Sequence, residues 1–368
     1  MKFRIGLVGL PNVGKSTLFN ALIKKAKADV ANYPFCTIEP NIGRVAIPDR
    51  RLEEIAKKEG SREVTPATIE FVDIAGLVKG ASKGAGLGNQ FLAHIREVPA
   101  IAYVLRCFLD EDVIHVEGTV DPIRDAEILD LELVLADLDS IKGRKERVEK
   151  LAKSNKSAKS ELETLNKAEA FLEDFKPLRL VLDDFTEEEK AYLQKTLYLL
   201  SVKPVIYVAN VSEKDLAEKS NPLVGALKKK AELEGIPIVE VCAKVEAELV
   251  DFSEEEREEF LKALGIEEPG LNKLIREGAK LLDLITFFTV NPKEARSWLI
   301  KKGTKAPEAA GEIHSDMERG FIACEVISFE DYHRVKNLQQ AKELGLVRLE
   351  GRDYMVQDGD IIYFRFNV

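Results

Sequence analysis

The residues Gly9 to Ser16 read G-L-P-N-V-G-K-S, which has the G-x-x-x-x-G-K-[ST] spacing of a phosphate-binding loop. Residues 3–8 form an apolar run that predicts a buried strand, and residues 17–27 carry leucine and isoleucine at helical spacing. In that context the backbone N–H groups of the loop and the N-terminus of the helix favour phosphate oxygens. Lys15 would reach the β- and γ-phosphates, and the Ser16 hydroxyl would bind Mg²⁺. A glycine-rich turn that binds nothing is the alternative.

Two later segments offer further groups for a metal ion and the γ-phosphate. Thr37 lies in a loop with two prolines, where a nucleotide-controlled switch would place a second Mg²⁺ ligand; turn packing is the alternative role. The predicted strand 68–72 ends at Asp73, three residues before Gly76. Asp73 could hold Mg²⁺ through water, while the Gly76 amide meets the γ-phosphate.

The residue after this glycine is Leu77, where GTPases of the Ras type carry a glutamine that orients water. A leucine side chain can neither donate nor accept a hydrogen bond, so intrinsic hydrolysis should be slow, at or below the order of 10⁻⁴ s⁻¹. Another group must complete the site. His94 and His115 could each hydrogen-bond water near neutral pH, although a lone histidine is more often structural.

A base-recognition segment follows the predicted buried strand 205–209 and reads Asn210-Val211-Ser212-Glu213. Guanine-specific switches have N-K-x-D there, and the aspartate accepts both hydrogen bonds from the guanine edge. Glu213 is one methylene longer than that aspartate, and Val211 replaces the lysine that covers the base. We therefore predict that ATP binds at least as well as GTP. Cys242-Ala243-Lys244 is similar to the S-A-K loop that contacts the base through its backbone.

Taken together, these segments resemble the YchF family, the Obg-like ATPases, within the translation-factor-related P-loop GTPases. The matching strings are GLPNVGKST, NYPFCTIEPN, DIAGLVKGASKGAGLGNQ, NVSE and CAK, and the similarity covers nearly the whole chain. The resemblance implies an Mg²⁺-dependent nucleotidase that prefers or accepts ATP, with Leu77 replacing the catalytic glutamine. It also implies that His115, rather than His94, takes part in hydrolysis.

The site residues expected from the motifs and the resemblance fall into three groups. The expected catalytic residues are His115, Lys15 and Gly76. The expected nucleotide-binding residues are Asn12, Val13, Gly14, Lys15, Ser16, Thr17, Asn210, Val211, Glu213, Cys242, Ala243 and Lys244. The expected metal ligands are Ser16, Thr37 and Asp73, with Mg²⁺ as the cofactor.

Composition limits the class of protein. The chain has 368 residues, enough for two or three domains, and its 45% hydrophobic and 32% charged content is typical of soluble globular proteins. A net charge of −10 argues against a wholly basic nucleic-acid binder, and we expect no DNA partner. The four cysteines form no C-x-x-C pair, and no apolar run approaches 18 residues. We therefore expect a cytoplasmic protein with no membrane partner.

An insertion at residues 125–202 interrupts the nucleotide-binding region. Apolar residues at helical spacing predict an antiparallel helical hairpin with coiled-coil character, including Val134, Ile141, Leu151 and Phe175. Residues 141–160 contain eight lysine or arginine side chains and two glutamates. This local positive charge predicts an arm that faces RNA; a solvated helix face is the alternative.

The C-terminal region, residues 279–368, resembles a TGS domain, a ubiquitin-like β-grasp module. We predict strands at residues 285–290, 320–327 and 360–366, with a short helix at 292–300. The resemblance implies contact with RNA or a ribosome, but charges are nearly balanced here, so a protein-docking sheet or a lid over the nucleotide are alternatives. The predicted fold is α/β, with a P-loop domain at 1–124 and 203–278, a helical insertion at 125–202, and this TGS-like domain.

The function expected from the sequence is ATP hydrolysis, with GTP accepted, coupled to binding of ribosomes, the large ribosomal subunit or other RNA–protein assemblies. Two alternatives stay open: a GTP-specific translation-associated GTPase, and a nucleotide-gated binding module with negligible turnover. A P-loop kinase that phosphorylates a small molecule is disfavoured by the N-x-x-E segment and the terminal β-grasp.

Overall fold

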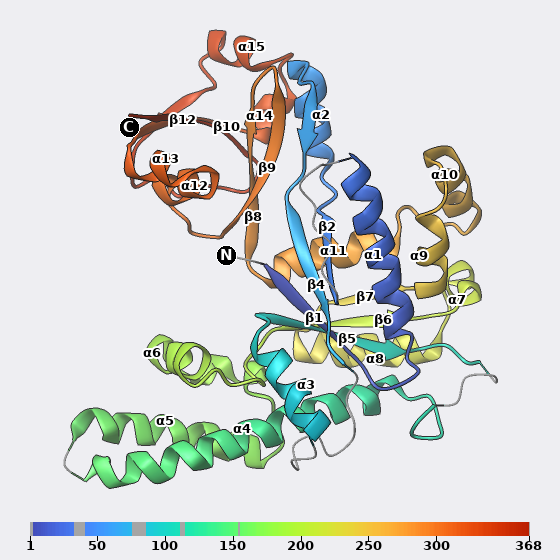
Figure 1. Cartoon of the computed structure of the whole chain (residues 1–368), viewed down its shortest axis with the longest axis vertical. Helices are drawn as coiled ribbons and strands as arrows, with labels where there is room; N and C mark the ends of the chain where they lie inside the picture. Colours follow the sequence, from blue (N-terminus) through green and yellow to red (C-terminus); the bar gives the residue numbers. More distant parts are fainter. Residues whose placement is uncertain (1–2, 33–40, 76–85, 111–114, 154, 368) are drawn as a thin grey trace. The chain divides into compact units, whose positions relative to one another are not determined.

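The computed structural model describes residues 3–32, 41–75, 86–110, 115–153 and 155–367, without the side chains of 29–32 and 86–89. The chain divides into two compact units (Figure 1). The first is Met1–Lys24, Glu39–Gly43 and Glu70–Leu274, and the second is Lys25–Ile38, Arg44–Ile69 and Ile275–Val368. Among the described helices, none is both long and apolar enough to span a bilayer.

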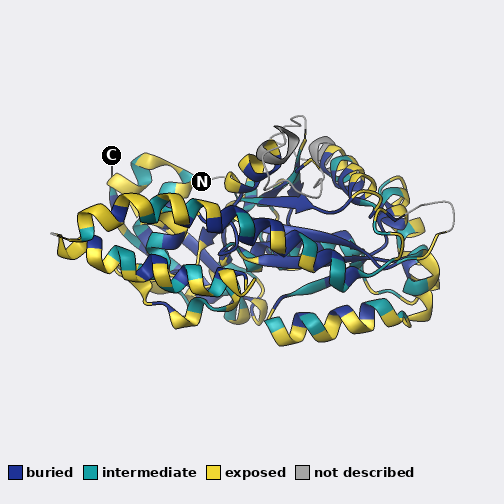
Figure 2. Cartoon of the chain, turned by 90° about the horizontal axis from the view of Figure 1, so that it is seen from below, coloured by how far each residue is buried: buried dark blue, intermediate teal, exposed yellow. Residues whose placement is uncertain are grey.

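A six-stranded sheet positions the predicted phosphate loop. Its strand order is β2-β4-β1-β5-β6-β7, and β1 pairs in parallel with β4 and β5, β5 with β6, and β6 with β7. Both faces of a parallel sheet are covered, so its central strands are mostly apolar and lie inside the protein (Figure 2). Every residue of β5 and β6 is buried. The strands are β1 (Arg4–Val8), β2 (Ile42–Ala46), β4 (Thr68–Asp73), β5 (Ala100–Arg106), β6 (Val205–Asn210) and β7 (Ile238–Val241).

Helices connect these parallel strands, as βαβ topology requires. α8 shows why they begin and end where they do: Asn221 caps its first turn, Pro222 occupies the first helical position, and Gly235 ends it with φ 65°. The helices associated with this sheet are α1 (Lys15–Asn32), α3 (Gly86–Arg96), α7 (Glu213–Glu218), α8 (Pro222–Glu234), α9 (Ala243–Leu249), α10 (Glu254–Ala263) and α11 (Gly270–Leu281).

The insertion contains two long helices, α4 (Pro122–Ala152) and α5 (Lys156–Glu173), which lie side by side (Figure 1). The two helices are antiparallel, and Arg144 and Lys145 of α4 form ion pairs with Glu161 and Glu169 of α5. Two 3₁₀ turns, Leu178–Leu180 and Leu182–Asp184, then α6 (Glu187–Ala191) and a π-helical turn, Tyr192–Thr196, complete the insertion.

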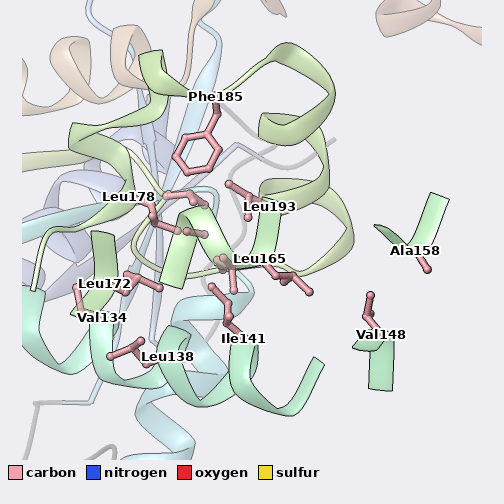
Figure 3. Packing of buried hydrophobic residues seen from close by; sticks show 13 residues of the cluster. Val134, Leu138, Ile141, Val148, Ala158, Leu165, Leu172, Leu178, Phe185 and Leu193 are labelled. Atoms are coloured by element: carbon pink, nitrogen blue, oxygen red, sulfur yellow. The ribbon is translucent and has the colours of Figure 1, made fainter. Parts of the chain in front are cut away.

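A buried apolar cluster holds the hairpin together (Figure 3). Val134, Leu138 and Ile141 of α4 pack with leucines of α5 and of the segment that follows it. The expected hydrophobic stripe is therefore largely present. Leu151 and Phe175, however, have exposed fractions of 60% and 61%, although Ala152 packs against the cluster and Leu172 and Leu178 belong to it. Leu151 and Phe175 do not belong to the core of the insertion.

The second unit contains a mixed six-stranded sheet of order β11-β10-β12-β8-β9-β3. β8–β9 and β10–β12 are antiparallel pairs, and β12 and β8 are parallel. Its later strands are β8 (Leu284–Val290), β9 (Glu294–Lys301), β10 (Phe321–Ser328), β11 (Arg348–Glu350) and β12 (Asp360–Phe366). α12 (Ala306–Ile313) and α13 (Ser315–Arg319) pack in one of its hydrophobic clusters.

One prediction for this unit is wrong. Residues 292–300 were expected to form a short helix, whereas Glu294–Lys301 is strand β9, with Ala295, Ser297 and Leu299 buried at every second position. Pairing with β8 over seven residues, from Leu284 to Val290, overrides the local preference.

Two early elements of the chain complete the second unit. β3 (Glu63–Thr65) pairs in parallel with β9, and α2 (Arg50–Glu59) packs in a cluster with α14 (Phe329–His333) and α15 (Leu338–Glu343). The predicted nucleotide-binding domain had included these two elements. The predicted domain boundaries themselves stay a prediction.

Candidate nucleotide site

The loop between β1 and α1 has the backbone that a phosphate loop needs. Asn12 and Gly14 have φ values of 63° and 92°, in the left-handed region. A Cβ atom on Gly14 would lie 2.1 Å from Nδ2 of Asn210, so a larger residue there would collide with a buried side chain as well as strain the backbone. The glycine of the motif is therefore required by its tertiary neighbour.

Asn210, at the end of β6, joins three segments of the site. Its Nδ2 donates a 2.9 Å hydrogen bond to the Val13 carbonyl, and its Oδ1 accepts a 3.0 Å bond from the Ala243 N–H. Its backbone carbonyl accepts a 2.8 Å bond from the Cys107 N–H. The structure thus brings the predicted phosphate loop, the N-V-S-E segment and the C-A-K loop together at the carboxyl edge of the parallel sheet.

Lys15 and Asp73 form an ion pair beside this loop. Lys15 begins α1 and is buried, and Asp73 is the last residue of β4. Ser16 and Thr17 lie exposed in the first turn of α1, next to the pair. The predicted phosphate and metal ligands Lys15, Ser16 and Asp73 are therefore close in space.

This donor set fits Mg²⁺. The Ser16 hydroxyl and the Asp73 carboxylate are hard oxygen ligands, and nucleotide-bound Mg²⁺ uses only one or two carboxylates together with phosphates and water. Within the described ranges no three His, Cys, Asp or Glu side chains are grouped as an all-protein metal site.

The predicted base-binding segment divides into buried and exposed residues. Val211 is buried and its N–H donates a 2.9 Å bond to the Val241 carbonyl. Cys242 is also buried, and burial raises the pKa of its thiol. Glu213 and Lys244 are exposed. The side chains of Glu213 and Lys244 could therefore contact a nucleotide base only at the protein surface.

Asp215, two residues beyond Glu213, stabilises the start of α7 and does not extend toward a base. Ser212 caps α7, and the Asp215 carboxylate accepts hydrogen bonds of 3.0 Å from the Ser212 N–H and 2.6 Å from its hydroxyl. The Asp215 carboxylate is thus engaged within the capping box.

The two candidate histidines differ in environment. His94, on α3, is exposed, whereas the His115 side chain is 2% exposed and lies 2.8 Å from Asp125, a residue that the sequence analysis did not single out. Asp125 could have been found as a charged residue on the apolar stripe of α4, four residues before Leu129. Thr37, Gly76 and Leu77 lie outside the described residues, and their roles stay predictions.

The class of protein follows from this arrangement. A phosphate loop between the first strand and helix, with an aspartate ending one neighbouring strand and an asparagine ending another, defines a P-loop nucleotide-binding protein of the GTPase type. The 50S ribosome-binding GTPase family matches residues 4–167. The YchF GTPase C-terminal family, described as "Protein of unknown function (DUF933)", matches residues 284–367.

Full-length relatives narrow this class. The chain is 52% identical to the ribosome-binding ATPase YchF of Bacillus subtilis over 370 residues, covering 100% of both chains. It is also 52% identical to the protein of that name from Escherichia coli O157:H7, with the same coverage. The solved YchF GTPase of Schizosaccharomyces pombe matches with a TM-score of 0.89 and 38% identity, covering 99% of this chain and 98% of that one. The chain belongs to the YchF family, and the predicted α/β fold with a P-loop domain is confirmed.

Proposed function

We propose that the protein is an Mg²⁺-dependent ATPase that also accepts GTP, and that its nucleotide state controls binding to ribosomes or ribonucleoprotein. The observation that carries the proposal is the Asn210 side chain, which ties the phosphate loop to both base-binding segments. The full-length relatives named ribosome-binding ATPase YchF support it. A ribosome-bound role also implies the cytoplasm as its location.

Phosphate binding would use Lys15, Ser16 and Asp73, which already lie together, and also Thr37 and Gly76, which lie outside the described residues. Lys15 would exchange its Asp73 partner for the β- and γ-phosphates, and Ser16, Asp73 and Thr37 would hold Mg²⁺. The metal ion, when bound, neutralises charge that develops on the phosphate oxygens. The Gly76 amide would bind the γ-phosphate.

Hydrolysis requires a group other than Leu77 to orient water, and His115 is the proposed residue. His115→Ala should therefore lose most of its turnover while ATP affinity stays close to that of the unsubstituted protein. His94→Ala is the matched control on an exposed histidine. Full turnover in His115→Ala would remove this residue from the mechanism.

Acceptance of adenine is supported by the absence of an available aspartate in the N-V-S-E segment. Glu213 is exposed, and the Asp215 carboxylate is hydrogen-bonded to Ser212. A guanine base would thus lack the rigid carboxylate that distinguishes it from adenine.

Parallel titrations of the purified protein with ATP and GTP, followed by measurement of phosphate release, test the proposal. We expect ATP to bind at least as tightly as GTP and to be hydrolysed to ADP and phosphate. A tenfold tighter affinity for GTP would instead support a GTP-specific translation-associated GTPase.

The helical hairpin is the proposed RNA-facing element. Of its eight clustered cations, Arg144 and Lys145 pair with glutamates of α5. The remaining six are exposed near the end of the hairpin: Lys142, Arg147, Lys150, Lys153, Lys156 and Lys159. An exposed cluster of one sign suits the phosphate backbone of RNA.

A further inference from the structure

A buried hydrogen bond joins His115 to Asp125, which lies in the first turn of α4. Nε2 of His115 is 2.8 Å from Oδ2 of Asp125, and the two side chains are 2% and 1% exposed. The other ring nitrogen, Nδ1, accepts a 3.1 Å hydrogen bond from the Glu117 N–H. Both nitrogens of the proposed hydrolytic histidine are therefore engaged within the chain.

These two hydrogen bonds select the same tautomer. A backbone N–H can only donate, so Nδ1 must carry a lone pair. Oδ1 of Asp125 accepts a 3.1 Å bond from Arg124, which favours an ionised carboxylate, and an ionised carboxylate can only accept. The nitrogen that faces Asp125 must then carry the proton, and the ring is held as the Nε2–H form.

The two hydrogen bonds differ in how firmly they are held. Asp125 lies in the first turn of α4, and Arg124 beside it is anchored on Thr119 by bonds of 3.0 Å and 2.6 Å. Glu117, in contrast, lies in an irregular turn and offers one neutral hydrogen bond. Because hydrogen bonds to charged groups are stronger, Nδ1 is the nitrogen that can be released at lower cost.

We propose that Asp125 is a positioning residue for His115: it holds the Nε2–H proton and leaves Nδ1 as the nitrogen that accepts a hydrogen bond from the attacking water. This inference rests on the proposed role of His115 in hydrolysis. A carboxylate that fixes the tautomer of a histidine is a recurring device in hydrolases and metal sites.

The test uses the full-length protein with ¹⁵N-labelled histidine. The chain has four histidines, so few ring signals overlap, and His115→Gln identifies the resonances of His115. Asp125→Asn removes the charge at nearly constant volume and lets an amide face the ring. Asp121→Asn is the matched control, because it removes a carboxylate from the same helix terminus and asparagine remains a good cap.

We expect the unsubstituted protein to show the Nε2–H tautomer at His115. Asp125→Asn should shift the Nε2 signal of His115, because a neutral amide replaces the carboxylate that accepts its proton, and it should lower kcat by roughly 10- to 100-fold with little change in KM. Asp121→Asn should leave both unchanged. Unaltered kcat in Asp125→Asn, or a higher kcat, would overturn the proposal.

The tautomer readout keeps this inference separate from the proposed function. Full turnover in His115→Gln would reject the role of His115 itself. Loss of turnover in His115→Gln with full turnover in Asp125→Asn would reject only the role of Asp125. An Nδ1–H signal in the unsubstituted protein would overturn the proposal even if Asp125→Asn failed to fold.

Discussion

At the scale of single residues, the neighbours of a side chain decide what the sequence motif means. Gly14 is required because Asn210 leaves no room for a Cβ atom. Lys15 lies against Asp73, 58 residues away. Asp137, a buried carboxylate of α4, has no counterpart in any motif, yet it accepts 2.7 Å hydrogen bonds from the N–H groups of Leu200 and Ser201.

Gly14→Ala should weaken ATP binding by roughly 10- to 100-fold, because a non-glycine residue at this φ costs about 1–3 kcal/mol before the clash with Asn210 is counted. Binding of a fluorescent ATP analogue measures the change in affinity. Gly143→Ala is the control: it lies within α4 with no atom within 4 Å of its Cβ position, so it should leave affinity unchanged. Equal affinity in both variants would contradict the proposed phosphate loop.

Asp137 should make the insertion less stable as pH rises from about 4 to about 6. Burial raises the pKa of its carboxyl from 3.8 to about 6, so between these values the folded protein holds the proton and the unfolded chain has lost it. The free energy of unfolding therefore falls across this window, by about 3 kcal/mol for the full shift.

Urea unfolding followed by circular dichroism at several pH values measures this effect. In Asp137→Asn the free energy of unfolding should no longer fall across this pH window. In Asp139→Asn, which changes an exposed neighbour on the same helix, the fall should remain. Identical pH profiles for the Asp137 variant and the unsubstituted protein would show that this carboxyl titrates normally.

At the scale of elements, the cations of the helical hairpin fall into two groups: some form ion pairs that hold the two helices together, and others are exposed and could bind a partner. The buried cluster of the hairpin and the pairs of Arg144 and Lys145 with α5 hold the two helices together, so these two cations contribute to packing. The six exposed cations remain for a partner.

Neutralising three of these exposed cations, Lys150, Lys153 and Lys156, to glutamine should weaken co-sedimentation with ribosomes. Binding should also depend less on salt. The slope of log affinity against log salt concentration should become shallower by about one unit for each RNA phosphate that the variant no longer neutralises. Lys229→Gln with Lys262→Gln, two exposed lysines on α8 and α10, is the matched control. Unchanged co-sedimentation in the triple variant would contradict the proposal that the helical hairpin contacts RNA.

At the scale of the whole molecule, the proposed function joins nucleotide binding to ribosome binding. A ligand can shift a partner's affinity only if the two nucleotide states differ in how they interact with that partner. We therefore expect ribosome co-sedimentation to differ between ADP and a non-hydrolysable ATP analogue, and Lys15→Ala to abolish the difference. Equal ribosome binding in both nucleotide states would be compatible with ATPase activity but would contradict nucleotide control of ribosome binding.

The sequence by itself determined the phosphate loop, most parallel strands and the helical hairpin, because each depends on local spacing of glycine, apolar and capping residues. Only the tertiary structure decided that β9 is a strand, that β3 and α2 complete the second sheet, and that Asn210 and Asp125 hold the loop and the histidine. These features depend on strand pairing and on buried hydrogen bonds between residues that the folded chain brings together. The spacing of residues along the sequence cannot specify such interactions, because they stabilise the protein only when the folded chain has brought both partners together and excluded water.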